Sequence, residues 1–393
     1  MPALTAYFSG LSLNTFLLAL ASLFADISTE MLYPVLPIFL TQTLGASAGV
    51  VGLVEGIAQA TQNLIQGLSG WLSDRARRRK PLALLGYSIA AVAKPLMGLA
   101  PSWPAVLGAR SLDRLGAGMR SAPRDALVAE SVADADRGKA FGIEGFGDNL
   151  GACIGPLLAI VLLSQLQLEL RSIFLLAVIP GALAAVMTLF VREKPPGRHV
   201  AATIELGFAR FPRSYWSYLV TIALFGIGNS SNAFLILRAR DLGASLTTTI
   251  FIYALFNLVA ALASYPAGYL SDTLGRKGVL LCSFLVFFVS YAGFALTTDI
   301  VAIGVLFVLY GIHQGVFRAV GKALATDLVP AQLRASGVGW YTATIGLSGL
   351  IASIVGGQLW TRIGPPATFF FGASSALVGS IALTMLVPSH RGD

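Results

Sequence analysis

The chain has 393 residues, of which 55% are hydrophobic and only 12% are charged, and its formal net charge is +8. A soluble domain carries about 25% charged residues, so this composition excludes an ordinary soluble protein. The cations lie in short segments between apolar stretches instead of forming a basic solvated face, which excludes nucleic acid as a partner. Two cysteines, Cys153 and Cys282, both in apolar segments, are too few for a disulfide framework or a cysteine-based metal site.

Several stretches of eighteen or more residues contain no Asp, Glu, Lys or Arg, for example 172–191, 242–271 and 335–361. A bilayer core needs ~20 apolar residues per helix, so the sequence predicts an all-α, multi-pass membrane protein whose surroundings are lipid. With breaks at Gly, Pro and charges, we predict twelve helices, at 11–38, 46–72, 81–100, 103–126, 138–165, 172–192, 214–236, 244–271, 278–298, 300–324, 335–360 and 366–387. The first thirty residues lack a basic start and a cleavage site, so we read them as a span and not a signal peptide.

The first predicted helix carries Asp26 and Glu30 one turn apart, with Tyr33 on the same face, and the second carries Glu55. An ionisable group at a helix centre costs ~2.5 kcal/mol or more in a membrane, so such groups indicate function. A carboxylate in a hydrated crevice can carry a proton if its exposure alternates between the two sides. We expect Asp26 to be the main proton-coupling residue, with Glu30, Glu55 and Asp113 as further candidates.

The bend after the second helix is strongly basic. Directly after Asp74 come five cations, Arg75, Arg77, Arg78, Arg79 and Lys80, and cations recur in the bends at 137–139, 276–277 and 334. The opposite bends at 41–47, 100–104 and 297–298 contain none, and only Arg171, Arg238, Arg240 and Arg362 lie on that side. Because cytoplasmic loops retain Lys and Arg, we predict that both termini are cytoplasmic.

The fourth predicted helix is the most charged span. It contains Arg110, Asp113, Arg114, Arg120, Arg124 and Asp125. At 3.6 residues per turn these six positions fall within an arc of about 140°, so one face is polar. We expect that face to line a watery cavity, in which Arg110, Arg114 and Tyr33 contact the substrate. Asp113 is one turn from Arg110, so it forms either a static, neutralised cluster or a second proton site.

The fifth predicted helix places Glu144, Asp148, Gly151 and Gly155 on one face, followed by Pro156. This face is polar near the cytoplasmic end and then small, which is typical of close contact between membrane helices.

A hydrophilic interval with Pro195, Pro196, Gly197 and Pro212 divides the chain. We predict an N-terminal six-helix bundle at 1–192, a cytoplasmic linker at 193–213 and a C-terminal six-helix bundle at 214–393. The two halves contain a repeat: Gly-Trp-Leu-Ser-Asp at 70–74 recurs as Gly-Tyr-Leu-Ser-Asp at 268–272, displaced by 198 positions. Arg137 and Arg334 match at a displacement of 197, which indicates duplicated halves.

The second half has fewer polar groups inside its spans. Asn229 and Asn232 lie near Gly226 and Gly228, which predicts a softened helix whose amide side chains either contact substrate or serve only in packing. His313, Gln314 and Arg318 follow one another in the tenth predicted helix, and we count all three as cavity candidates. His313 either takes part in a proton relay or is a hydrogen-bonded packing group.

The sequence Gly70-x-Leu72-x-Asp74-Arg75 followed by Arg78-Arg79 resembles the loop 2–3 signature of the major facilitator superfamily, and the resemblance extends over essentially the whole chain. Arg77 replaces one family glycine, whereas the C-terminal copy at Gly268, Asp272, Gly275 and Arg276 keeps it. The resemblance implies a fold of twelve helices in two pseudo-symmetric bundles. It also implies that Asp74 is a cytoplasmic latch of the outward-facing state, a role that the cation cluster alone leaves unexplained.

Two further motifs are similar to those of the drug/proton antiporter branch. Residues 109–116 match its fourth-helix motif, with Asp113 where that branch commonly has Gln. Residues 151–156 match its fifth-helix motif, without the closing glycines at 158–160. The resemblance implies proton-driven export.

These observations predict a secondary active transporter that works by alternating access, acts as a monomer in the cytoplasmic (inner) membrane and needs no cofactor beyond a proton gradient. Its cargo is a small molecule, drug-like or metabolite. The surplus of cations on the fourth helix favours a second possibility, an anionic metabolite moved in either direction. We find no H-E-x-x-H, no G-x-S-x-G and no P-loop, so an enzyme is not expected, and duplicated halves suit rocking better than a channel.

Overall fold

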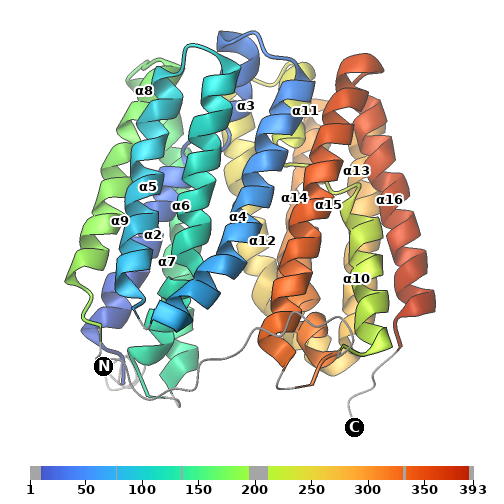
Figure 1. The fold of residues 1–393 in the computed structure, drawn as a ribbon. Coiled ribbons are helices and arrows are strands. Elements are labelled where there is room, and N and C mark those ends of the chain that lie inside the picture. Colours follow the sequence, from blue (N-terminus) through green and yellow to red (C-terminus); the bar gives the residue numbers. More distant parts are fainter. Residues whose placement is uncertain (1–9, 77, 134–135, 194–210, 331–332, 389–393) are drawn as a thin grey trace, which may run out of the picture. The chain divides into compact units, whose positions relative to one another are not determined.

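The computed structural model describes residues 10–76, 78–133, 136–193, 211–330 and 333–388, and within these ranges the regular structure is entirely helical (Figure 1). The all-helical prediction is therefore confirmed. Within the helices, the side chains of Asp74, Arg75, Arg137, Asp272 and Arg334, among others, lie outside the described part of the chain.

The helices of the first half are α2 (Leu13–Glu30), α3 (Leu36–Ile38), η1 (Phe39–Thr43), α4 (Ala48–Ala76), α5 (Lys80–Leu99), α6 (Trp103–Glu130), α7 (Arg137–Ile160), η3 (Val161–Gln165), α8 (Leu170–Leu176) and α9 (Val178–Phe190). Those of the second half are α10 (Arg213–Gly226), α11 (Ala233–Asp241), α12 (Leu246–Leu274), α13 (Arg276–Leu296), α14 (Ile300–Asp327), α15 (Arg334–Arg362) and α16 (Pro365–Leu386). Most predicted ends are correct to within four residues.

Three predicted spans are not continuous helices. The first ends at Glu30 and resumes as α3 and η1, because Pro34 and Pro37 lack the N–H groups that would continue the ladder. The sixth is interrupted at Ala177, because Pro180, near the start of α9, also lacks a backbone N–H group. The seventh is broken between α10 and α11, where Gly226 and Gly228 precede the polar residues. The softened seventh helix is thus confirmed as a break.

Eight helices in the described part of the chain are long and apolar enough to cross a membrane. The predicted spans outside this group include two of the three broken ones, at α2 and α10–α11, and the highly charged α6. All three contain polar residues that the sequence indicates as candidates for function.

The chain forms two compact units, each with its own packing. Unit 1 comprises residues 1–33 and 64–203, and unit 2 comprises residues 34–63 and 204–393, so α4 contributes to both. In unit 1, α5 packs along α6 and α2 packs along α7. In unit 2, α12 packs along α14 and α13 packs along α16.

Equivalent contacts in the two halves support the duplication. Arg79 forms an ion pair with Glu130 at the end of α6, and Arg276 Nε lies 2.8 Å from Asp327 Oδ2 at the end of α14. Both partners of the second pair lie 197 positions after their counterparts, so 79–130 and 276–327 align without a gap. The following lysine is also equivalent: Lys80 Nζ donates to a carbonyl near the end of α9, and Lys277 Nζ does so at the end of α16.

Small residues allow α7 to touch the backbone of α2. A Cβ atom placed on Gly147 or Gly151 would lie 2.5 Å from the carbonyl oxygen of Ala19 or Leu23, and one on Gly155 would lie 2.9 Å from that of Ile27. Three glycines four residues apart thus meet three carbonyls four residues apart. The close-contact face predicted for the fifth helix packs on α2 and brings it beside Asp26.

Substituting Gly151 tests this contact. Gly151→Ala should destabilise the protein by about 1–3 kcal/mol, because the new methyl group forces two packed helices apart. Gly145→Ala on the same helix is the matched control, since a Cβ there meets nothing within 4 Å. Thermal unfolding in detergent measures both. Equal melting temperatures for the two variants would contradict the proposed close contact.

Candidate transport site

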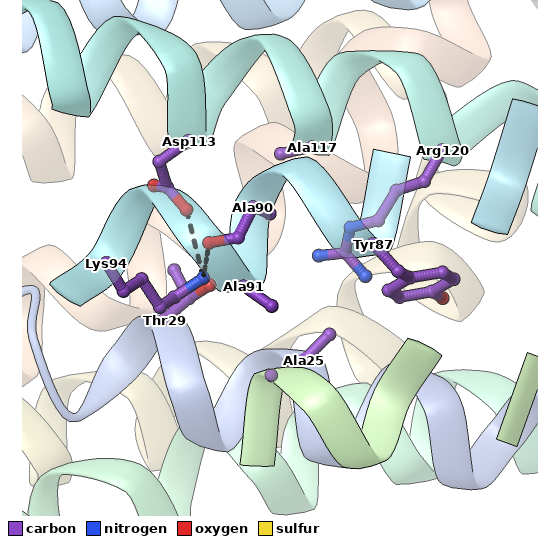
Figure 2. Close-up of a pocket in the computed structure, with 10 residues that line it drawn as sticks. Ala25, Thr29, Tyr87, Ala90, Ala91, Lys94, Asp113, Ala117 and Arg120 are labelled. Atoms are coloured by element: carbon purple, nitrogen blue, oxygen red, sulfur yellow. Dashed lines mark hydrogen bonds and ion pairs between the residues drawn. The ribbon is translucent and has the colours of Figure 1, made fainter. Parts of the chain in front are cut away.

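The most buried charges of unit 1 surround Asp113. Lys94 Nζ lies 2.9 Å from Asp113 Oδ1, while Arg110 Nη1 and Arg114 Nη2 lie 3.2 and 2.8 Å from Oδ2 (Figure 2 draws Lys94 and Asp113). Arg110, Lys94 and Asp113 are 1 to 2% exposed. We call these four residues the Asp113 cluster. One buried carboxylate thus meets three cations.

The crossing of α5 and α6 brings this cluster together. Gly86 and Gly116 face each other so closely that a Cβ on either would lie 2.6 Å from the carbonyl oxygen of the other. The helices then run side by side, and Lys94 reaches Asp113. Sequence reasoning missed Lys94, although a lone cation inside the 81–100 span is itself a signal that a carboxylate on another span must compensate it.

Arg120 lies further along α6. Its Nη2 is 3.8 Å from Asp26 Oδ1, and its guanidinium carbon lies 4.6 Å from the centre of the Tyr87 ring. The distance to Asp26 is too long for a hydrogen bond. Asp26 also packs against α7, because a Cβ on Gly151 would lie 2.9 Å from the Asp26 Cβ. Asp148 lies one turn before Gly151, so α2 and α7 bring two carboxylates into the same region of unit 1.

A second cluster surrounds Arg124 and consists of Arg124, Asp125, Glu144, Asp148 and Ser22. Arg124 Nη1 lies 2.8 Å from Glu144 Oε1 and 3.8 Å from Asp148 Oδ1, and Nη2 lies 2.8 Å from Asp125 Oδ1. Ser22 Oγ donates to Glu144 Oε1 at 2.6 Å. We call it the Arg124 cluster. It ties α2, α6 and α7 together, and the side chains of Asp125 and Asp148 remain 44 and 46% exposed.

The sequence-predicted sites of the N-terminal half divide by exposure. Arg110 and Asp113 lie in the interior of unit 1, contrary to the expectation that the whole charged face of the fourth helix is hydrated. Asp26, Glu30 and Arg114 are half-buried. Tyr33 does meet Arg110, whose guanidinium carbon lies 5.7 Å from the ring centre. Glu55 is buried on the part of α4 that belongs to unit 2.

The candidates of the C-terminal half lie in unit 2. Tyr310 donates to Asn232 Oδ1 at 2.8 Å and approaches Asn229 Oδ1 at 3.5 Å, which steadies the break between α10 and α11. His313 is fully buried, with Nδ1 2.9 Å from Ser283 Oγ and the ring packed among aromatic side chains. Gln314 is half-buried and Arg318 is exposed.

The predicted latch is described only in part. Gly70 packs against Ala122 of α6, Arg78 is exposed, and Arg79 and Arg276 form the ion pairs given above, whereas Gly268 has open space beside it. The side chains of Asp74, Arg75 and Asp272 lie outside the described part of the chain. Among the described residues, no group of three or more His, Cys, Asp and Glu could hold a metal ion.

Two helical units of duplicated register, with ionisable groups inside the spans, define a transporter of the secondary type. The family model of the Major Facilitator Superfamily matches residues 18–238 and again residues 219–393, so the chain belongs to that superfamily. The chain is 35% identical over 382 residues to an uncharacterized MFS-type transporter of Methanocaldococcus jannaschii, covering 96% of this chain and 95% of the relative.

A second relative is a probable 4-methylmuconolactone transporter of Cupriavidus pinatubonensis, 31% identical over 90% of this chain and 85% of the relative. Among solved structures, the D323A mutant of the nucleoside transporter NupG is similar, with a TM-score of 0.82, 16% identity and coverage of 95% of this chain and all of that one. This likeness establishes the fold, in which two bundles of helices make up the transporter.

Asp113 should be essential for the stability of unit 1. Asp113→Asn leaves three cations without their carboxylate, which should cost about 3–5 kcal/mol. Adding Lys94→Met to this variant should restore part of the loss, because one uncompensated cation is removed. The readout is thermal unfolding of purified protein in detergent.

The matched control for this test is Asp241→Asn. Asp241 also pairs with an arginine three residues away, Arg238, but its side chain is 44% exposed, so its loss should cost about 1 kcal/mol or less. If Asp113→Asn were no worse than the control, Asp113 would not be the group that neutralises the cluster.

Proposed function

We propose that this superfamily member is a proton-coupled exporter of a small organic molecule, working by alternating access, with Asp26 and Asp148 as its proton-coupling pair. The observation that carries the proposal is the packing of Asp26 on α2 against Gly151 of α7, one turn from Asp148, with Arg120 Nη2 3.8 Å from Asp26 Oδ1. When either carboxylate is protonated, the two no longer repel each other. When Asp26 releases its proton, its negative charge is again attracted by Arg120. Both side chains are partly exposed, at 21 and 46%, so protons can reach them.

Asp113 is less suited to this role. Its two oxygens already accept from Lys94, Arg110 and Arg114 at hydrogen-bond distance, and it is 1% exposed. Of the two readings left open for Asp113, the geometry therefore favours the static, neutralised cluster, while Asp26 remains the first candidate for coupling. Glu30, one turn from Asp26 and close to Gly155, is the second.

The remaining parts of the proposal follow from the charge pattern. The basic bends support cytoplasmic termini and a location in the cytoplasmic membrane. Export is supported by the antiporter-type motifs at 109–116 and 151–156, the second of which packs α7 on α2 beside Asp26. We further propose that the protein works as a monomer without a cofactor, and that the loop around Asp74 latches one state of the transport cycle.

Asp26→Asn tests the coupling. In proteoliposomes with an imposed pH gradient, cargo-linked proton flux should fall to the level of empty vesicles, because Asn cannot exchange a proton. Counterflow of cargo without a gradient should persist, since the binding residues are untouched. Asp136→Asn, a carboxylate paired with Lys139 in the 131–137 bend, is the control and should retain flux. Gradient-driven transport by Asp26→Asn at the normal rate would rule out the assignment.

A second candidate function is transport of an organic anion. The three cations gathered around Asp113 favour it, and Arg114, whose side chain is 11% exposed, is the most exposed of them. The guanidinium of Arg114 can donate charge-assisted hydrogen bonds to an anionic cargo.

Arg114→Gln separates the two kinds of cargo. The transport rate of a carboxylate probe should fall about tenfold or more, because the loss of one charge-assisted hydrogen bond weakens binding by about that factor. The transport rate of an uncharged ester of the same probe should change little. Arg171→Gln is the control, because Arg171 binds the backbone carbonyls of Gly98 and Ala100. Equal losses for the acid and the ester would argue against anion recognition.

A further inference from the structure

A small cavity inside unit 1 separates two cations. It is lined by Ala25, Thr29, Tyr87, Ala90, Ala91, Lys94, Asp113, Ala117, Arg120 and Gly181. Figure 2 shows the Lys94 ammonium and the Arg120 guanidinium entering it from opposite ends, with Ala91 and Ala117 between them. The empty volume is about 240 Å³ when space open to solvent is included. The part that a water-sized sphere can occupy has room for about one water molecule.

Two cations, Lys94 and Arg120, bring hydrogen-bond donors to this space, which the hydroxyls of Thr29 and Tyr87 and the carboxylate of Asp113 also line. Arg120 is 9% exposed, and its Nε and Nη1 atoms have no hydrogen-bond partner among the described residues. Lys94 Nζ uses two of its three protons on Asp113 and the Ala90 carbonyl. Buried donors without acceptors are costly, so they call for an acceptor in the cavity.

The local charge favours an anion over water. Asp113 already compensates three cations, and the carboxylate nearest to Arg120, on Asp26, lies 3.8 Å away. A water molecule could find acceptors at Asp113 and at the hydroxyls of Thr29 and Tyr87, but it would leave the charge of Arg120 without a hydrogen-bonded anion. An occupant that carries one negative charge satisfies the free donors of Arg120 and Lys94 and also places an anion beside Arg120.

The second half of the chain has aromatic residues at the equivalent positions. In the register set by the two ion pairs, Ala90 corresponds to Phe287 and Arg120 to Phe317. Phe287 is fully buried, with its ring centre 3.9 Å from that of Tyr291 and 4.9 Å from that of His313. The equivalent helix pair is thus packed with aromatic rings, whereas unit 1 has small residues between two cations.

We propose that this cavity is a binding site for one small monovalent anion, with chloride as the ion of suitable size, held between Lys94 and Arg120. The site shares Arg120 with the proton-coupling pair but includes neither Asp26 nor Asp148, and the role of the ion is to compensate the charge of Arg120. It does not depend on the direction of transport or on the identity of the cargo.

The test is the halide dependence of thermal stability. Purified protein in detergent is exchanged into gluconate buffer and titrated with chloride or bromide at constant ionic strength. A ligand that binds only the folded state stabilises it, so the melting temperature should rise by a few degrees and then saturate. Equilibrium binding of radioactive chloride should give one ion per chain.

Two variants locate the ion. Ala117→Val fills the space between the cations without removing either, and Lys94→Met removes one of them, so both should abolish the halide response. Lys139→Met, at a 40% exposed lysine, is the matched control and should keep it. If Lys94→Met does not fold, Ala117→Val and radioactive chloride binding still decide the question.

The absence of a saturable halide effect in the wild-type protein would overturn the proposal in favour of a water molecule. A response that survives Ala117→Val would place the ion elsewhere and overturn it as well. Because the readout is stability and binding, loss of proton-coupled transport in Asp26→Asn leaves this result unaffected.

Discussion

Unit 1 depends on compensating the arginines of a single helix. α6 carries four arginines inside a membrane span, and each meets a carboxylate: Arg110 and Arg114 share Asp113, Arg120 approaches Asp26, and Arg124 binds Glu144. The acids on α2 and α7 reach α6 because glycines on α7 let these helices pack backbone to backbone. Charge compensation and close packing therefore require each other, since a buried arginine without its acid would be too costly to keep in the bilayer.

Equivalent helices cross in both halves of the chain, but different residue types form the contacts. With a constant displacement of 197, the pairs Lys94–Asp113, Gly86–Gly116 and Tyr87–Arg120 correspond to Tyr291–Tyr310, Ser283–His313 and Phe284–Phe317. A helix crossing made by two glycines in one half is thus made by a serine–histidine hydrogen bond in the other. This equivalence favours a packing role for His313 over a proton relay, because its position belongs to the crossing itself.

Much of this arrangement could be predicted from the sequence. Charge-free stretches and basic bends located the helices, and the repeated motif at 70 and 268 set the register of the duplication almost correctly. The burial of each side chain could not be predicted. A helical wheel places Arg110 and Arg114 on the same face, but it does not show which of the two a neighbouring helix covers. Lys94 was overlooked for the same reason: it lies alone on an apolar helix, and its meaning comes only from Asp113, nineteen residues later.

Charged residues that stabilise the fold differ from those that must change their protonation during transport. A group that couples transport to protons must change its charge during the cycle, so its surroundings have to tolerate both forms. The Asp113 cluster does not tolerate a neutral Asp113, because three cations would then repel one another in the interior of unit 1. Asp26 differs: when it is neutral, Arg120 keeps the ring of Tyr87 at 4.6 Å, and Arg124 retains its own acids. We therefore expect the arginines of α6 to keep Asp113 permanently ionised and to leave Asp26, on α2, able to exchange its proton.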